Sequence, residues 1–102
     1  MGEFVKVAAT TEIQAQKCKK VEVQGKRFAL CRVEGKILAI DDACAHMGGS
    51  LSEGDIDGDQ IECPRHGARF KISTGELLRG PGTEGVRTYP VRVNGADIEL
   101  EV

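Results

Sequence analysis

Two short motifs near the middle of the chain contain the residue types that bind transition metals. The first motif is Cys44-x-His46 and the second is Cys63-x-x-His66, with sixteen residues between His46 and Cys63. His46 and His66 are the only histidines in the protein. Because iron–sulfur clusters and zinc both accept thiolate and imidazole ligands, these four residues form the candidate metal site.

Each motif offers one sulfur and one nitrogen, and this donor set suits a [2Fe–2S] cluster. If both cysteines bind one iron and both histidines bind the other, the net charge of the oxidised cluster is about zero, whereas four thiolates would give about −2. A less negative cluster accepts an electron more readily. Structural zinc is the alternative, but its usual pattern begins with two cysteines and ends with two histidines, and here each motif mixes the two ligand types.

The same residues resemble those of the Rieske family of [2Fe–2S] proteins. The resemblance is carried by the pattern Cys-x-His…Cys-x-x-His-Gly, by Cys-Pro-Arg-His-Gly-Ala-Arg-Phe at 63–70, and by Ser-Thr-Gly-Glu at 73–76. Within that family the chain resembles the small soluble ferredoxins of bacterial ring-hydroxylating oxygenase systems, and it has about their length. The two-part ligand motif is the specific part of this match.

The resemblance implies a Rieske-type [2Fe–2S] cluster and a place for each ligand. Cys44 and Cys63 would bind a buried iron, and His46 and His66 would bind an outer iron whose imidazole edges lie near the surface. The family also has a proline-containing loop that covers the cluster, and the resemblance places Pro81 in it.

Four positions differ from those of high-potential Rieske proteins. Such proteins have cysteines, joined as a disulfide, where this chain has Gly49 and Arg65. They also have Ser and Tyr, which donate hydrogen bonds to cluster and ligand sulfurs, where this chain has Ala68 and Phe70. The resemblance is therefore to the low-potential branch, which favours an oxygenase-type carrier over a quinol-oxidising role.

The function implied by the resemblance is that of a one-electron carrier, not of an enzyme by itself. Such a carrier takes electrons from an NAD(P)H-dependent flavin reductase and passes them to a terminal oxygenase. The residues agree, because no Gly-x-Gly-x-x-Gly nucleotide motif is present and both histidines are assigned as ligands. The alternatives are a small Rieske-like subunit of an assimilatory nitrite reductase and a structural zinc-binding module.

Length and composition limit the possible classes of protein. With 102 residues the chain is expected to form a single domain, residues 1–102, whose cluster-binding part spans about 42–82. A net charge of −2 argues against a nucleic-acid partner. The sequence contains no apolar run long enough for a membrane span and begins without the apolar region of a signal peptide, so we expect a soluble, cytoplasmic protein.

Two further cysteines, Cys18 and Cys31, lie outside the ligand motifs. Four cysteines in a small chain can form a disulfide framework, but two are assigned to the cluster, and cytosolic thiols usually stay reduced. Cys31 falls in an apolar strand and is predicted to be a core residue. Cys18 falls in a basic run with no histidine or second cysteine nearby in the sequence, and is predicted to be a surface thiol.

Apolar residues alternate with polar ones between short turns, which predicts an all-β sandwich or barrel. The resemblance implies the Rieske-type form, an antiparallel β-sandwich with a small cluster-binding subdomain of two ligand loops. In the strongest strand, 27–33, Phe28 and Leu30 face one side, whereas Ala29, Cys31 and Val33 face the other. The segment 10–17 is consistent with either a helix or a loop. The other predicted strands cover 4–7, 21–23, 36–40, 69–72, 76–78, 86–93 and 96–102, the last two joined by a turn at Asn94-Gly95.

The run from Glu53 to Asp59 is acidic, and aspartates alternate along it at 55, 57 and 59. A calcium loop of the EF-hand type would need Gly where Gln60 stands and Glu where His66 stands. A hairpin turn at Asp57-Gly58 is the preferred interpretation. As a solvated acidic surface, the run is also a candidate for docking a basic reductase.

Overall fold

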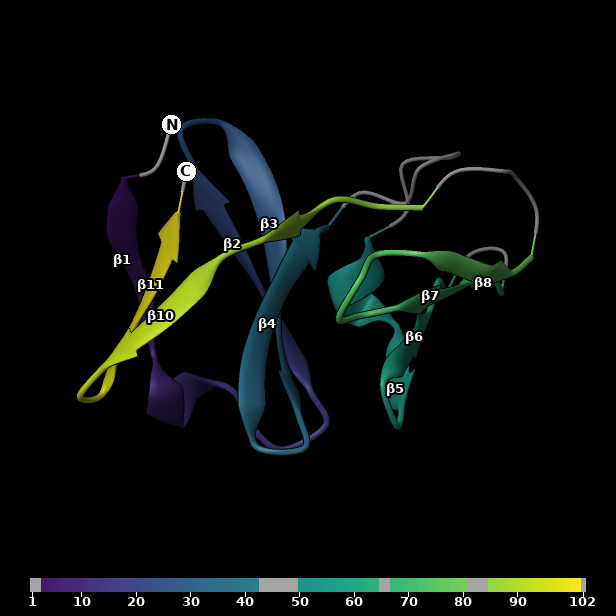
Figure 1. The fold of residues 1–102 in the computed structure, drawn as a ribbon, viewed down its shortest axis with the longest axis horizontal. Coiled ribbons are helices and arrows are strands. Elements are labelled where there is room, and N and C mark those ends of the chain that lie inside the picture. Colours follow the sequence, from purple (N-terminus) through teal and green to yellow (C-terminus); the bar gives the residue numbers. More distant parts are fainter. Residues whose placement is uncertain (1–2, 43–49, 65–66, 81–84, 102) are drawn as a thin grey trace.

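The computed structural model describes residues 3–42, 50–64, 67–80 and 85–101. Within these ranges the chain forms eleven strands in three antiparallel sheets, together with two single-turn 3-10 helices (Figure 1). Two of the sheets make up the larger part of the molecule, on the left in Figure 1, and the third makes up the smaller part on the right. The predicted all-β class is confirmed.

The sheets combine strands that are distant in sequence. The first sheet has the order β1-β11-β10, with β1 Phe4–Ala9, β11 Asp97–Glu101 and β10 Val91–Asn94. The second has the order β2-β3-β4-β9, with β2 Cys18–Val23, β3 Lys26–Val33, β4 Lys36–Asp41 and β9 Thr88–Tyr89. The third has the order β5-β6-β7-β8, with β5 Asp55–Asp57, β6 Gln60–Glu62, β7 Arg69–Lys71 and β8 Leu77–Arg79.

Tight turns set the register of the second sheet. Gln24 and Gly25, between β2 and β3, have φ of +55° and +81°, and Glu34 and Gly35, between β3 and β4, have φ of +51° and +83°. Two-residue loops in which both φ angles are positive match the twist of antiparallel strands. Both turns are therefore of the kind that joins neighbouring antiparallel strands.

Strand β3 is buried on both faces, and the predicted alternation of its side chains is confirmed. Phe28 and Leu30 belong to a core between the first and second sheets, to which Ile98 and Leu100 of β11 also belong. The other face of β3 belongs to a second core, shared with the third sheet, whose buried members are Ala29, Cys31, Val33, Ile40, Leu51, Ile61, Cys63, Ala68, Phe70 and Ile72. The second sheet is thus the layer on which the third sheet rests.

The prediction of one continuous strand over 86–93 is wrong. The segment is divided at Pro90 into β9, which pairs with β4, and β10, which pairs with β11. Proline has no N–H to donate to a ladder, so a strand commonly ends at such a residue. The chain passes from the second sheet to the first at this point, and the Pro90 carbonyl accepts a hydrogen bond from the Glu101 N–H (3.1 Å).

The segment 10–17 contains one 3-10 turn, η1 (Thr10–Glu12), followed by irregular chain. The Glu12 carboxylate accepts a hydrogen bond from the Ala9 N–H (2.9 Å), which lowers the pKa of Glu12. The other 3-10 helix, η2 (Leu51–Glu53), is equally short. Neither these helices nor any other in the described part of the chain has the length and apolarity needed to cross a bilayer.

The predicted surface thiol at Cys18 is wrong. Strand β2 begins at Cys18, three residues earlier than expected, and the register with β3 places Cys18 directly opposite Cys31. The two residues form a disulfide. Sequence distance concealed this pair, because the cysteines are 13 residues apart and meet only through the hairpin. The prediction that Cys31 is a core residue is confirmed, since it is fully buried.

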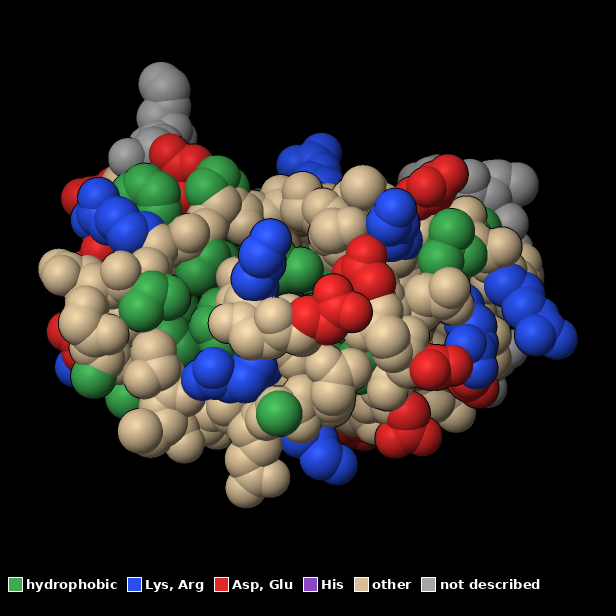
Figure 2. Space-filling model, turned by 60° about the horizontal axis from the view of Figure 1, so that its bottom comes forward, with side chains coloured by type: hydrophobic (Ala, Val, Ile, Leu, Met, Phe, Trp, Pro, Cys, Tyr) green, Lys and Arg blue, Asp and Glu red, His purple; other side chains and the backbone are tan. Residues whose placement is uncertain are grey.

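The acidic run 53–59 forms the end of η2, strand β5 and the turn into β6. The predicted hairpin is present, but its loop residues are Gly58, at φ +64°, and Asp59, one position later than predicted. Arg69 on β7 lies 3.4 Å from a carboxylate oxygen of Asp57 and 3.0 Å from one of Glu62, and so partly neutralises the run. On the face that Figure 2 shows, acidic and basic side chains accordingly lie next to one another.

Candidate metal centre

Of the four predicted ligands, the structure describes Cys63. It is fully buried and follows directly after β6. Cys44, His46 and His66 lie outside the described residues, as does Pro81 of the predicted covering loop. The geometry of the site is therefore given by Cys63 and by the described residues that flank the other three ligands.

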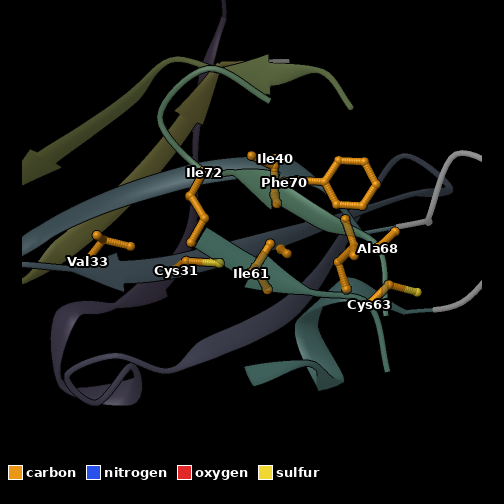
Figure 3. Close-up of a cluster of buried hydrophobic side chains, with 10 residues drawn as sticks. Cys31, Val33, Ile40, Ile61, Cys63, Ala68, Phe70 and Ile72 are labelled. Atoms are coloured by element: carbon orange, nitrogen blue, oxygen red, sulfur yellow. The ribbon is translucent and has the colours of Figure 1, made fainter. Parts of the chain in front are cut away.

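A tight turn holds Cys63 in place. The Cys63 N–H donates to the Ala68 carbonyl (2.7 Å), and the Gly67 N–H donates to the Cys63 carbonyl (3.0 Å). Gly67 has φ +73°, a conformation that favours glycine. Cys63 and Ala68 lie next to each other in Figure 3. The chain leaves β6 at Cys63 and rejoins the sheet at β7, so the second motif is a short loop fixed at both ends.

The ends of the first ligand loop are held together by Asp42, the one buried charged side chain among the described residues. The Ser50 hydroxyl lies 2.7 and 3.0 Å from the two carboxylate oxygens of Asp42, and the Ser52 N–H donates to the same carboxylate (2.9 Å). The Asp42 carbonyl accepts from the Leu51 N–H (2.6 Å). These bonds form a clasp, Asp42–Ser50–Ser52, that closes the loop containing Cys44.

The clasp residues were not predicted from the sequence. In the sequence, Asp42 follows another aspartate and precedes the first motif, and aspartates are usually exposed. The available signal was an acid two residues before Cys44 together with serines at 50 and 52, residue types that form local hydrogen bonds. Only the buried setting distinguishes Asp42 from an ordinary surface acid.

Described residues next to both motifs belong to one apolar core. Leu51, which follows the first loop, is fully buried in the same cluster as Cys63, Ala68 and Phe70. Cys63, Ala68 and Phe70 lie close together in Figure 3. The chain therefore leaves the first loop and enters the second motif at the same layer of side chains.

The described residues on either side of 81–84 lie against the third sheet. Gly80 packs so closely on Ala68 that a Cβ at Gly80 would lie 2.5 Å from the Ala68 Cα. On the other side, the Val86 N–H donates to the Gly75 carbonyl (2.7 Å). Pro81 itself lies outside the described residues, so its place over the cluster stays a prediction.

The Tyr89 side chain on β9 is hydrogen-bonded to Asp41, the last residue of β4. Its hydroxyl donates to the Asp41 carboxylate (2.5 Å), which also accepts from the Arg87 N–H (3.1 Å). Burial and the hydrogen bond to Asp41 raise the pKa of Tyr89 above its usual value of 10.0. Since Asp41 directly precedes the clasp residue Asp42, these bonds fix the strand end from which the first ligand loop departs.

The residues present fit a [2Fe–2S] cluster. The donor set is two thiols and two imidazoles, and the described thiol of Cys63 lies in an apolar, water-poor core that suits an inorganic cluster of low net charge. Ala68 and Phe70, on the same short stretch, offer no side-chain hydrogen-bond donors. When bound, the cluster supplies one-electron redox chemistry, and the chain positions and shields it.

Comparison with known proteins agrees with this site. Residues 3–90 match the Rieske [2Fe-2S] domain family. The chain is 37% identical over 100 residues to the ferredoxin component of the naphthalene 1,2-dioxygenase system of Pseudomonas aeruginosa, covering 98% of this chain and 96% of that one. It is 33% identical over 99 residues to the biphenyl dioxygenase ferredoxin subunit of a Pseudomonas species, covering 96% and 91%.

A solved structure shows the same fold. A chain in the complex of reduced oxygenase and oxidized ferredoxin in carbazole 1,9a-dioxygenase superposes with a TM-score of 0.90 at 34% identity, covering 96% of this chain and 92% of that one. The protein belongs to the Rieske [2Fe–2S] family. Within that family its relatives are the ferredoxin components of dioxygenase systems, which are electron carriers and not catalysts themselves.

Proposed function

We propose that this protein is a cytoplasmic one-electron carrier that takes electrons from an NAD(P)H-dependent flavin reductase and passes them to a terminal oxygenase. The observation that carries the proposal is the shared apolar core in which the fully buried Cys63 lies together with Leu51, a residue that follows the first motif. The chain folds as one Rieske domain over residues 1–102, and its cluster-binding part spans about 42–82.

In this proposal each ligand has a definite role. Cys44 and Cys63 bind the inner iron, and His46 and His66 bind the outer iron. The hydrogen-bonded turn at Cys63 and the clasp at Asp42 support the assignment, because the turn positions Cys63 on the core and the clasp joins the described residues on either side of the first loop.

The partners follow from the relatives. The naphthalene and biphenyl relatives are named as components of dioxygenase systems, and the carbazole structure is described as a complex of oxygenase with ferredoxin. A terminal oxygenase is therefore the electron acceptor we propose. A flavin reductase is the proposed donor, because a one-electron carrier needs a partner that divides the two electrons of NAD(P)H.

Stepwise reduction and reoxidation test this function. The purified protein is mixed without oxygen with NADH and the reductase of a naphthalene dioxygenase system, and then with the oxidised terminal oxygenase. We expect a red-brown protein that takes up one electron per chain and returns it to the oxygenase. The His66→Ala variant, with its ligand set broken, should lose this exchange.

Two results would count against the proposal. A colourless protein that contains zinc would show a structural metal site. A protein that holds the cluster but exchanges no electrons with oxygenases of this type would place the same fold in another pathway, and the iron content distinguishes the two cases.

A further inference from the structure

The disulfide between Cys18 and Cys31 lies outside the cluster site and is not needed to carry an electron. Cys18 is the first residue of β2, and Cys31 is its partner across the ladder on β3. The Cα atoms of the two residues are 4.1 Å apart.

The backbone bonds explain why the pair is so close. Next to it, the Arg32 N–H donates to the Lys17 carbonyl (3.0 Å) and the Arg32 carbonyl accepts from the Gln16 N–H (2.9 Å). Arg32 thus makes the ladder bonds at this step, so the following pair, Cys18 and Cys31, is a non-hydrogen-bonded one. Side chains approach most closely at such pairs in an antiparallel ladder.

The two residues differ in their exposure to solvent. Cys31 is fully buried, whereas Cys18 packs against the same core but is partly exposed on β2, which is an edge strand of its sheet. A small reagent should therefore reach Cys18 more readily than Cys31. Cys18 is therefore the residue expected to react first with a disulfide reagent, and Cys31 is the residue expected to attack the mixed disulfide that forms on Cys18.

The surroundings of Cys18 are basic. Lys17 and Lys20 are exposed, while Lys19 is paired with Glu12 at 3.4 Å. A positive flank raises the local concentration of anionic reagents. Glutathione disulfide, with its four carboxylates, is an oxidant of this kind.

We propose that Cys18 and Cys31 form a thiol–disulfide exchange site for low-molecular-weight disulfides of the glutathione class. The Cys18 thiolate attacks glutathione disulfide, the bond between its sulfurs breaks, and one glutathione leaves while a mixed disulfide forms on Cys18. Cys31 then loses its proton, attacks the Cys18 sulfur and releases the second glutathione. In total the two protein thiols are oxidised by two electrons, and one glutathione disulfide is reduced to two glutathiones.

The Cys18–Cys31 disulfide includes a residue of the core on which the third sheet rests. Cys31 belongs to the core shared with Ile61 and Ile72 of the third sheet, and these side chains lie beside it in Figure 3. A cross-link between β2 and β3 restrains the unfolded chain and ties the edge strand to this layer. The oxidised form should therefore resist unfolding better than the dithiol form.

Thiol counting on the cluster-loaded protein tests the exchange. The reduced protein is equilibrated with glutathione disulfide and quenched in acid, and the thiols that remain are alkylated under denaturing conditions and weighed. We expect the wild type to lose two alkylatable thiols of its four without gaining glutathione, while the visible spectrum of the cluster stays unchanged. If all four thiols remain, or if glutathione adducts accumulate on the wild type, the proposal is wrong.

Single variants test the order of the two steps. Cys31→Ser should trap one glutathione on Cys18, whereas Cys18→Ser should react at least about tenfold more slowly, because Cys31 is buried. Equal adduct formation in the two variants would overturn the assigned roles. Because neither residue is a proposed cluster ligand, this result is independent of whether the cluster and its electron transfer are as proposed.

Two further measurements check the charge and the stability. The double variant Lys17→Gln, Lys20→Gln should slow oxidation by glutathione disulfide but not by uncharged hydroxyethyl disulfide. Oxidation should raise the urea midpoint of the wild type by about 1 M or more and leave that of Cys18→Ser unchanged. An equal rise in both proteins would show that the stabilisation does not come from this bond.

Discussion

Ala68 and Phe70 are the positions at which the resemblance predicts an effect on the redox potential. Both are fully buried in the core that contains Cys63, and neither side chain has a hydrogen-bond donor. Donors aimed at the sulfurs would favour the reduced cluster, which is the more negative form. Their absence therefore predicts a low potential, near the lower end of the Rieske range.

Restoring a hydroxyl group at either position should raise the potential. A hydrogen bond to a charged group contributes roughly 1.5–3 kcal/mol, of which about 1 kcal/mol would differ between the redox states. Since 1.4 kcal/mol corresponds to about 59 mV for one electron, Ala68→Ser and Phe70→Tyr should each raise the potential by about 40 mV. Redox titration measures the shift, with Phe70→Leu as a control that adds no donor. No rise in either variant would mean that these side chains do not point at the sulfurs.

Tyr89 gives the protein a pH dependence in the alkaline range. Burial and the hydrogen bond to Asp41 raise its pKa in the folded state above the usual value of 10.0. Folding thus favours the neutral phenol. The contribution of Tyr89 to the unfolding free energy is fully present below about pH 10 and is lost as the pH rises through the folded-state pKa. The unfolding free energy of the wild type should exceed that of Tyr89→Phe at pH 8, and the two should converge at higher pH. Urea titrations across this range measure the difference, and a constant gap would contradict the assignment.

At the scale of elements, the first ligand loop depends on the clasp that closes it. Ser50→Ala removes the hydroxyl that contacts both carboxylate oxygens of Asp42. Because this hydrogen bond reaches a buried carboxylate, its loss should lower the unfolding free energy by about 1.5–3 kcal/mol and speed loss of the cluster. Ser52→Ala is the matched control, since the Ser52 hydroxyl contacts Ser50 and its backbone N–H continues to serve Asp42. Bleaching in the presence of a chelator measures cluster loss, and equal rates for the two variants would show that the clasp has no special role.

The elements also show what the sequence could and could not predict. The strands, the two β3 faces and the tight turns followed from local patterns, because alternation and turn residues are written in neighbouring positions. The Cys18–Cys31 pair, the clasp at Asp42 and the change of sheet at Pro90 did not. Each of these depends on tertiary partners, which a single strand or loop does not specify.

The ligand motifs were visible from the sequence because metal chemistry restricts residue type and spacing together. What the fold adds is the common core in which Leu51, from η2 after the first loop, lies with Cys63 and Ala68. That convergence comes from the pairing of β5, β6 and β7 and could not be read from spacing alone.

At the scale of the whole molecule, the acidic hairpin is the surface on which charge could guide a partner. Asp55 and Asp57 are exposed, although Arg69 partly neutralises Asp57. Asp55→Asn with Asp57→Asn should slow reduction by the reductase at low salt, because steering charges act over about 10 Å at 0.1 M ionic strength. The cluster potential should change little.

The control is a second double variant that has the same net charge as the Asp55→Asn, Asp57→Asn protein. Glu22→Gln with Glu34→Gln removes two exposed carboxylates from the larger part of the molecule. Stopped-flow reduction of the three proteins, repeated at high salt, is the measurement. Should both double variants slow equally at low salt, net charge and not this hairpin would guide the encounter.

The ligand set is the central claim, and the nitrogen couplings of the reduced cluster test it most directly. Protein labelled with ¹⁵N only at histidine is reduced, and pulsed EPR then measures hyperfine couplings to the paramagnetic cluster. We predict two directly bound ¹⁵N nuclei in the wild type, and loss of this native spectrum in His46→Ala and in His66→Ala. A reduced cluster that shows no histidine coupling, or that keeps the native spectrum and full iron in both variants, would contradict the account.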